Sequence, residues 1–350
     1  LPVHLTFLVD TSGSMRASNK LPLARRALKE LVANLDDEDR VAIATYAGST
    51  GIALNPTRVG DGRQAIVAAL DGLEHGGGTN MGSGMQLAYD MALATYEPGT
   101  ENRVIVLSDG DANIGRTSHE QILKSLAGYA KKGITLSTIG FGNGNYNDTM
   151  MEQLANKGDG NYYYIDSFAE ARKVFGEKLT ATVQTVARDV KIQVDMDPGS
   201  VISYRLIGYE NRDIADADFR NDAVDAGEIG SGHTVTALYD LVLRDDPAED
   251  LATVRIRSKA PGPDAPSVER ATRLPSLAVR TSFATATPDF RVAIGTAAFA
   301  EKLRGSPWAD ELPWSEIADT VRSAGRSGDA ELVGLVETAG RLRAGDLAVR

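Results

Sequence analysis

The first residues able to do chemistry stand near the start of the chain, directly after an apolar run. Asp10, Ser12 and Ser14 follow residues 5–9, whose sequence is Leu-Thr-Phe-Leu-Val. We expect a buried strand to end here and a turn to begin, because the apolar run gives way to small polar residues and glycine. One carboxylate and two hydroxyls would then lie together at the end of a strand.

Two further oxygen donors occupy comparable positions later in the sequence. Thr79 follows Gly76-Gly77-Gly78, and Asp109 directly follows the apolar run 104–108. With the first three residues they make five hard oxygen donors from three loops, a ligand set suited to a hexacoordinate divalent cation. Because only two of the five carry charge, a bound ion would stay electron-poor and attract an acidic ligand from outside.

Mg²⁺ is the ion that we expect at these five residues, with Mn²⁺ or Ca²⁺ as alternatives. Mg²⁺ requires near-octahedral geometry and tolerates retained water ligands, whereas a cage of many carboxylates favours a closed calcium site. Asp-x-Ser-x-Ser alone is equally typical of a turn in which these side chains bond the local backbone. Thr79 and Asp109, at matching positions, favour metal binding over that alternative.

The first half of the sequence alternates strand patterns with helix patterns. We expect strands at 3–9, 40–46, 103–108, 134–139 and 162–165, with 50–54 pairing antiparallel. Helical spacing of apolar residues predicts helices at 21–35, 62–73, 82–95, 118–131, 149–156 and 168–185. Such alternation indicates an α/β fold with a doubly wound, mostly parallel sheet. Ligands bind such sheets beyond the carboxyl ends of the strands, where Asp10 and Asp109 both lie.

The second half of the sequence follows a different pattern. Strand patterns at 190–194, 203–209, 234–243 and 253–258, and a further candidate at 281–287, predict an antiparallel, sandwich-like β region. Helical periodicity returns after residue 288 and is clearest from Leu332 to Leu342. We therefore divide the chain into 1–186, a metal-binding α/β domain, 187–287, a β-rich domain, and 288–350, a helical segment.

The five oxygen donors and their surroundings resemble the von Willebrand factor type A (VWA) family and its metal-ion-dependent adhesion site. Residues 7–15, 77–81 and 107–110 carry the resemblance, which extends over roughly residues 1–185. It implies a Rossmann-like fold in which Ser12 and Ser14 bind the ion directly, and Asp10, Asp109 and Thr79 bind it directly or through water. It also implies that an Asp or Glu of a protein partner completes the coordination.

Residues 138–142 and 161–165 narrow the resemblance to bacterial exported proteins with this domain and an extra C-terminal region. This implies an extracytoplasmic location, in the periplasm or at the cell surface. The sequence begins at Leu1 without Met, which we interpret as a shortened or processed chain; any signal peptide or lipid anchor would then lie upstream. No stretch approaches the ~20 apolar residues of a membrane span.

Composition excludes several classes of function. The 350 residues carry a net charge of −11 and contain no Lys/Arg-rich run, which argues against nucleic acid and anionic lipid as partners. The lack of cysteine removes disulfides, thiolate nucleophiles and zinc–thiolate sites. The sequence gives no indication of the oligomeric state.

Several weaker motifs have a simpler structural explanation. Gly140-x-Gly142-x-Gly144 lacks dinucleotide-binding spacing and indicates a surface turn. The acidic stretch 210–228 lacks the spacing of an EF-hand and is typical of a solvated loop. Trp308 and Trp314 are expected to anchor packing between the tail helices and the β region.

The four histidines do not form a zinc-binding pattern. They are His4, His75, His119 and His233, and no pair has zinc-ligand spacing. His4 opens a strand and is expected to be structural. His75 is either an exposed loop residue, the interpretation we favour, or part of the rim of the metal site, since it stands four residues before Thr79.

These observations predict a divalent-metal-dependent protein-binding module for adhesion or scaffolding rather than an enzyme. Specificity would come from the loops around the site, namely 16–20, 80–83, 111–116 and 143–148. A metal-dependent hydrolase is one alternative, although the sequence offers no general base beyond the ligands and His75. The other alternative is the VWA subunit of an ATPase-driven assembly complex, which the attached β region makes less favourable.

Overall fold

The computed structural model describes residues 2–110, 122, 124, 128–130, 132–142, 148–177, 185–208, 214–224, 226–232, 234–261, 265–280 and 282–348. Side chains are described as far as residue 343. The chain forms two compact units. The first comprises Leu1–Ile192, Phe219–Thr234 and Ile256–Arg270, and the second comprises Gln193–Asp218, Val235–Arg255 and Ala271–Arg350.

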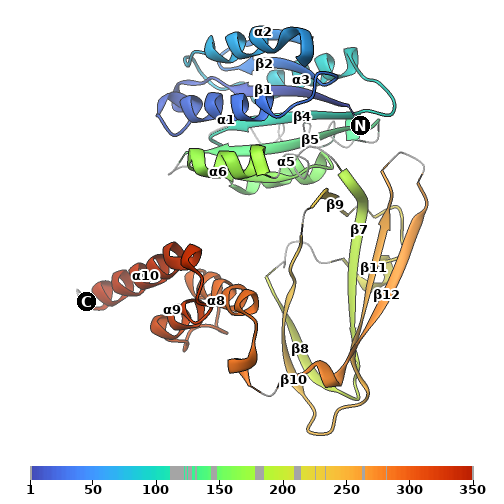
Figure 1. Cartoon of the computed structure of the whole chain (residues 1–350), viewed down its shortest axis with the longest axis vertical. Helices are drawn as coiled ribbons and strands as arrows, with labels where there is room; N and C mark the ends of the chain where they lie inside the picture. Colours follow the sequence, from blue (N-terminus) through green and yellow to red (C-terminus); the bar gives the residue numbers. More distant parts are fainter. Residues whose placement is uncertain are drawn as a thin grey trace. The chain divides into compact units, whose positions relative to one another are not determined.

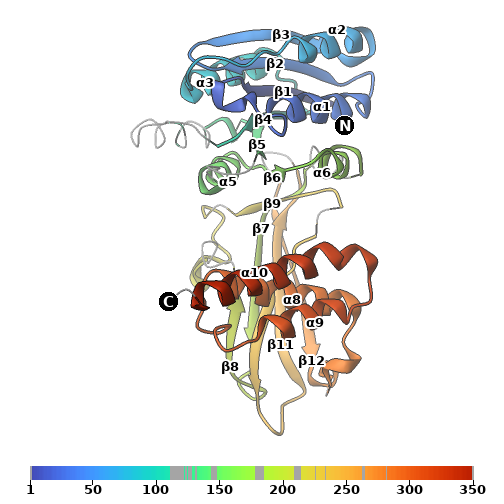
Figure 2. The same ribbon diagram turned by 90° about the vertical axis from the view of Figure 1, so that its left-hand side faces the viewer.

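A six-stranded sheet forms the centre of the first unit, in the order β3-β2-β1-β4-β5-β6 (Figures 1 and 2). All neighbouring strands pair in parallel except β3, which runs antiparallel to β2. The predicted doubly wound, mostly parallel fold is therefore confirmed. The strands are β1 (Val3–Asp10), β2 (Arg40–Tyr46), β3 (Thr50–Arg58), β4 (Glu101–Ser108), β5 (Ile134–Phe141) and β6 (Tyr162–Ile165).

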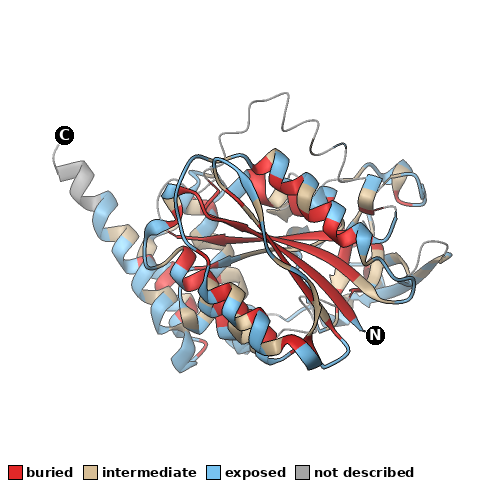
Figure 3. Cartoon of the chain, turned by 90° about the horizontal axis from the view of Figure 1, so that it is seen from above, coloured by how far each residue is buried: buried red, intermediate tan, exposed pale blue. Residues whose placement is uncertain are grey.

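Helices cover both faces of this sheet, so that its central strands are buried (Figure 3). Successive side chains of a strand point to opposite faces, so Phe7 and Val9 of β1 pack into one hydrophobic core and Leu8 into the other. The first core includes residues of α1 (Leu21–Ala33), α2 (Val59–Asp71) and α6 (Phe168–Arg172). The second includes residues of α3 (Met81–Ala94) and α5 (Asp148–Lys157).

Two of the predicted helices differ from the structure or lie largely outside its described residues. The helix predicted at 168–185 is wrong at its end: α6 stops at Arg172, a π-helical turn covers Lys173–Glu177, and Thr185 begins a strand. Most of the helix expected at 118–131 lies outside the described residues.

The predicted antiparallel β region is confirmed. Strands β12, β11, β7 and β9 form one sheet, and β10 and β8 form another. Two of these strands, β9 and β12, were not predicted, and the strand candidate at 281–287 is wrong because a short 3₁₀ turn occupies Phe283–Thr285. The strands are β7 (Thr185–Met196), β8 (Val201–Ile207), β9 (Gly227–Gly230), β10 (Leu238–Leu243), β11 (Asp250–Lys259) and β12 (Ser267–Pro275).

Three helices end the second unit, as predicted: α8 (Pro288–Leu303), α9 (Trp314–Arg322) and α10 (Ala330–Ala348). Trp314 packs edge-to-face against Phe299 of α8, with ring centroids 6.1 Å apart. Trp308, by contrast, is 69% exposed, and its ring lies 4.7 Å from the guanidinium of Arg205 on β8. Within the described parts of the chain, every helix falls short of the length and apolarity that a membrane crossing requires.

Candidate metal centre

Asp10 ends β1 in the middle of the sheet and is fully buried. Its Oδ1 accepts a hydrogen bond from the backbone N–H of Ser12 at 2.8 Å. Its Oδ2 accepts hydrogen bonds from the hydroxyls of Tyr46, at 3.1 Å, and Ser108, at 2.9 Å. Both hydroxyls come from the ends of the flanking strands β2 and β4, so the sheet itself holds the carboxylate in one orientation.

Ser12 and Ser14 lie in the turn that follows β1. Ser12 is buried and Ser14 is half-buried, and their hydroxyl oxygens are 2.9 Å apart. Ser14 belongs to a short 3₁₀ turn, Gly13–Arg16, and Ser12 is the extended N-cap residue of that turn. The turn therefore presents two neutral oxygens as an adjacent pair.

The loop that carries Thr79 is fastened to the same turn by backbone hydrogen bonds. The N–H of Gly76 donates to the carbonyl of Thr11 at 2.7 Å, and the N–H of Gly13 donates to the carbonyl of Gly77 at 3.2 Å. Gly77 has φ +79°, in the region that favours glycine, and a Cβ there would lie 3.2 Å from a neighbouring backbone nitrogen. The glycine run thus lets the loop approach closely, and Thr79 follows it, half-buried.

Asp109 follows the end of β4 and is 2% exposed. The turn around it is held by the N–H of Gly110, which donates to the Ser108 hydroxyl at 3.0 Å. Oδ2 of Asp109 accepts a hydrogen bond from the ammonium of Lys20 at 2.8 Å. Lys20 ends the loop 16–20, one of the loops expected to set specificity, but its pairing with Asp109 was not predicted.

Burial sets the electrostatics of the site. Desolvation raises the pKa of Asp10, the hydrogen bonds from Ser12 and Ser108 act in the opposite direction, and the charge of Asp109 adds to the rise. The pKa of Tyr46 is raised well above its usual value, chiefly by burial and next by the charge of Asp10. Two neighbouring buried carboxylates are costly unless cations compensate them, so the site favours the binding of positive charge.

The position of the site follows from the strand order. Strands β1 and β4 are neighbours at the point where the order 3-2-1 turns to 4-5-6, the topological switch point at which such sheets bind ligands. Among the described residues, no three His, Cys, Asp or Glu side chains gather as a group able to hold a metal. The donor set here is instead two carboxylates with hydroxyls, hard oxygen ligands that fit a small divalent ion.

The other sequence candidates lie elsewhere. His4 is buried and its Nδ1 lies 3.0 Å from the carbonyl oxygen of Thr95, which confirms its structural role. His75 is exposed. His119, His233 and the loop residues 111–116 and 143–147 lie outside the described residues.

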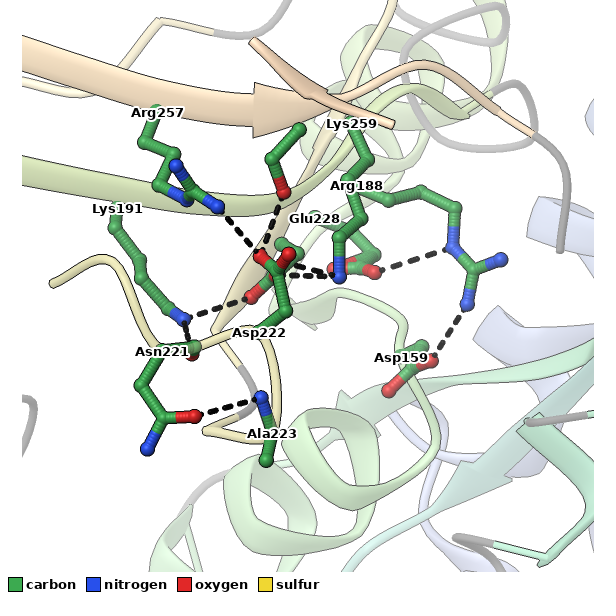
Figure 4. Close-up of polar contacts among 11 residues, drawn as sticks. Asp159, Arg188, Lys191, Asn221, Asp222, Ala223, Glu228, Arg257 and Lys259 are labelled. Atoms are coloured by element: carbon green, nitrogen blue, oxygen red, sulfur yellow. Dashed lines mark hydrogen bonds and ion pairs between the residues drawn. The ribbon is translucent and has the colours of Figure 1, made fainter. Parts of the chain in front are cut away.

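A second cluster of charges lies in the first unit, around the start of β7 (Figure 4). Its ion pairs include Arg188 with Asp159 at 3.1 Å, and Lys259 with Asp189 at 2.9 Å. We call this cluster the ion network; its described members are four acids, Asp159, Asp189, Asp222 and Glu228, and four bases, Arg188, Lys191, Arg257 and Lys259. Because the charges of these described members balance, the network fits a structural role better than a ligand site. The solvated loop expected at 210–228 is wrong for Glu228, which is 9% exposed and paired with Arg188.

Comparisons with known families agree with this arrangement. Residues 4–177 match the family described as the von Willebrand factor type A domain. Residues 181–250 match the family described as the C-terminal region of the uncharacterized protein YfbK.

Individual proteins are similar over different lengths. Uncharacterized protein YfbK of Escherichia coli (strain K12) is 38% identical over 341 residues, which cover 92% of this chain and 58% of that protein. Inter-alpha-trypsin inhibitor heavy chain H3 of Homo sapiens is 28% identical over 209 residues, 56% of this chain and 22% of that protein. The chain therefore spans less than two thirds of the length of these relatives.

A solved structure supports the fold over nearly the whole chain. The von Willebrand factor type A protein from Catenulispora acidiphila covers 95% of this chain and 82% of its own with a TM-score of 0.57, at 16% sequence identity. At this identity the likeness concerns the fold alone.

Proposed function

Residues 4–177 belong to the von Willebrand factor type A domain family, and from this premise we propose that the chain is a divalent-metal-dependent protein-binding module. An ion, Mg²⁺ by preference and Mn²⁺ or Ca²⁺ as alternatives, is held by Asp10, Ser12, Ser14, Thr79 and Asp109. An Asp or Glu of a protein partner then completes its coordination. When bound, the ion would provide an electron-poor centre that attracts this carboxylate.

One observation carries this proposal. The hydroxyls of Ser12 and Ser14 form a pair 2.9 Å apart, next to the buried carboxylate that accepts the Ser12 N–H. In a site of purely structural polar residues, each hydroxyl would satisfy itself on the nearby backbone. Here the two hydroxyls hydrogen-bond each other beside buried carboxylates at the carboxyl edge of the sheet, so their oxygens lie close enough together to bind one cation.

Metal titration tests the site. We expect isothermal titration of the chelator-treated protein with Mg²⁺ or Mn²⁺ to show one site, and the double variant Ser12→Ala/Asp109→Ala to lose it. The matched control is Ser323→Ala/Asp319→Ala, which removes one hydroxyl and one carboxylate from the exposed surface of α9. Equal uptake by wild type and the first double variant would remove the proposal.

Capture of partners tests the role of the ion. Affinity purification from native extracts with Mg²⁺ present should retain a partner protein, and a chelator should release it. Changing a single acidic residue of that partner should abolish the binding. A complex indifferent to both treatments would contradict metal-mediated binding. If the chain is instead a metal-dependent hydrolase, it should turn over phosphate or ester substrates, and Asp10→Ala should abolish that turnover. If it is a subunit of an ATPase-driven assembly complex, a nucleotide hydrolase should copurify with it.

We also propose a setting for this module. The similarity to an Escherichia coli protein supports a bacterial origin, and we propose an extracytoplasmic location, either periplasmic or at the cell surface. The division at 186/187 and 287/288 remains our proposal for the domain boundaries. Fractionation of the native host, with antibody detection of the protein, tests the location.

A further inference from the structure

The ammonium of Lys20 forms an ion pair with Asp109, one of the five proposed metal ligands. Lys20 Nζ lies 2.8 Å from Asp109 Oδ2, and the side chains of the two residues are 20% and 2% exposed. A partly buried lysine paired with a buried carboxylate interacts more strongly than an exposed surface pair. The site therefore contains a positive charge of its own before any ion is considered.

The position of Lys20 in the backbone is unfavourable for helix stability. Lys20 is the N-cap of α1, its side chain makes no capping hydrogen bond, and its backbone lies at φ −117° and ψ −112°. Helix N-termini favour Ser, Thr, Asp or Asn as caps and disfavour cations, because the N-terminal end of the helix dipole is positive. A lysine at this position therefore needs another reason, and the carboxylate of Asp109 offers one.

The space for the Lys20 side chain depends on a glycine in the neighbouring loop. A Cβ on Gly142 would lie 2.5 Å from Cε and 2.8 Å from Cγ of Lys20, and Gly142 itself has φ +87°. The aliphatic stem of Lys20 thus runs against bare backbone at the end of β5. The position of the Lys20 side chain is therefore set by contacts of its aliphatic stem as well as by the ion pair of its ammonium.

Counting charges at the site shows what this lysine would do. Asp10 and Asp109 contribute two negative charges, and Lys20 contributes one positive charge. Over these three described side chains, a divalent ion would bring the sum to +1, whereas without Lys20 it would be zero. Lys20 therefore adds to the attraction of a carboxylate, and the same lysine repels the ion and competes with it for Asp109.

We propose that Lys20 sets the specificity of this site by trading metal affinity for affinity towards an acidic ligand. The inference rests on the proposed metal site and goes beyond it by assigning a residue outside the five ligands. Asp109 is both a proposed ligand and the carboxylate that pairs with Lys20 through Oδ2, so the lysine and an ion would act on the same side chain. Lys20 would position the carboxylate of Asp109 by pairing with it, and its positive charge would favour an acidic ligand over the metal ion.

Metal affinity gives the first test. We expect Lys20→Met and Lys20→Ser to bind Mn²⁺ about tenfold more tightly than wild type in isothermal titration, because a nearby like charge is removed. Lys20→Ser also supplies a favoured N-cap, so it separates the loss of charge from any weakening of α1. Lys20→Arg, which keeps the charge, should stay closer to wild type than either neutral variant.

The control for net charge is Lys29→Met. Lys29 lies nine residues further along α1, where it pairs with Asp71, so this variant removes the same charge away from the site. It should leave Mn²⁺ affinity at the wild-type value. If Lys20→Met and Lys29→Met bind Mn²⁺ equally well, the proposal is wrong.

Affinity for a carboxylate gives the second test. Acetate is the probe, and its binding to the Mn²⁺-loaded protein is followed by the relaxation of Mn²⁺-bound water. We expect acetate to bind loaded Lys20→Met about fivefold more weakly than loaded wild type. Unchanged acetate affinity would overturn the specificity claim, whereas no Mn²⁺ uptake by wild type or variant would instead overturn the metal site on which it rests.

Discussion

The hydroxyl of Ser108 donates a hydrogen bond to Oδ2 of Asp10 at 2.9 Å, and it also accepts the N–H of Gly110 at 3.0 Å. One side chain therefore connects the carboxylate at the end of β1 to the turn that carries Asp109 after β4. Ser108 is fully buried and was not among the predicted site residues. Its contacts make it the supporting residue whose loss should disturb the site most directly.

Removing this hydroxyl should weaken the metal site without removing a proposed ligand. Ser108→Ala deprives Asp10 of a hydrogen bond that lowers its pKa, and such supporting partners typically contribute 10–100-fold to metal affinity. We expect Mn²⁺ affinity to fall about tenfold in isothermal titration. The control is Thr135→Val, which removes a buried hydroxyl at the opposite end of the sheet, on β5. Identical losses in the two variants would argue against a specific role for Ser108.

Arg103 should be one of the most important residues for stability in the first unit. Its guanidinium is 1% exposed and donates hydrogen bonds to Glu101 at 2.8 Å, Ser137 at 2.9 Å and Thr185 at 3.0 Å. Arg103→Met leaves these partners without their donor, and removing one member of a buried pair destabilises by about 3 kcal/mol. Urea unfolding followed by circular dichroism measures the loss. The double variant Arg103→Met/Glu101→Gln should recover part of it, and no recovery would mean that packing rather than charge dominates.

Two helical glycines of the second unit should respond to alanine in opposite ways. A Cβ on Gly295 of α8 would lie 2.5 Å from Cγ2 of Val321 on α9, whereas a Cβ on Gly334 of α10 would meet nothing within 4 Å. We expect Gly295→Ala to destabilise by about 2 kcal/mol through overpacking. Gly334→Ala should stabilise by about 0.5–1 kcal/mol through helix propensity. Chemical denaturation measures both, and Val321→Ala should relieve the strain of Gly295→Ala.

Asp222 should make stability depend on pH in acid. The hydrogen bond from Ser267 and then that from Arg257 lower the pKa of Asp222 from 3.8 to about 2. Because the folded-state pKa is the lower one, the stabilisation is present above pH 3.8 and is lost as the pH falls towards about 2. The difference in urea midpoint between wild type and Asp222→Asn should therefore shrink over this range. Carboxyl NMR titration of Ser267→Ala should show the pKa of Asp222 moving back towards 3.8, and an unmoved pKa would assign the shift to other groups.

The sequence predicted those elements whose structure follows from the local pattern of apolar and polar residues. Apolar runs between helical patterns predicted the mostly parallel sheet, because burial on both faces leaves the central strands nearly continuous in apolar residues. Asp10 and Asp109 could be placed at one edge because parallel strands end together. The edge strands at 50–54 and 162–165 were also predicted, the first of them as the antiparallel partner of the strand at 40–46.

Contacts between distant residues could not be predicted in the same way. Thr185 continues a helical pattern in sequence, yet it begins β7, where it pairs with Gly230 and bonds Arg103. β12 was missed because its side chains are largely exposed and give little apolar periodicity. Lys20 and Ser108 looked like ordinary polar residues, since nothing local distinguishes a lysine that will meet Asp109, 89 residues away.

The central position of β1 has a mechanical consequence. Asp10 ends a strand that is bonded along its length to β2 on one side and to β4 on the other, both in parallel. Tension applied at this end along the strand would load both hydrogen-bond ladders in shear, so many bonds would resist together instead of opening one after another. A partner that pulls on this end of β1 would therefore load the hydrogen bonds to both neighbouring strands at once.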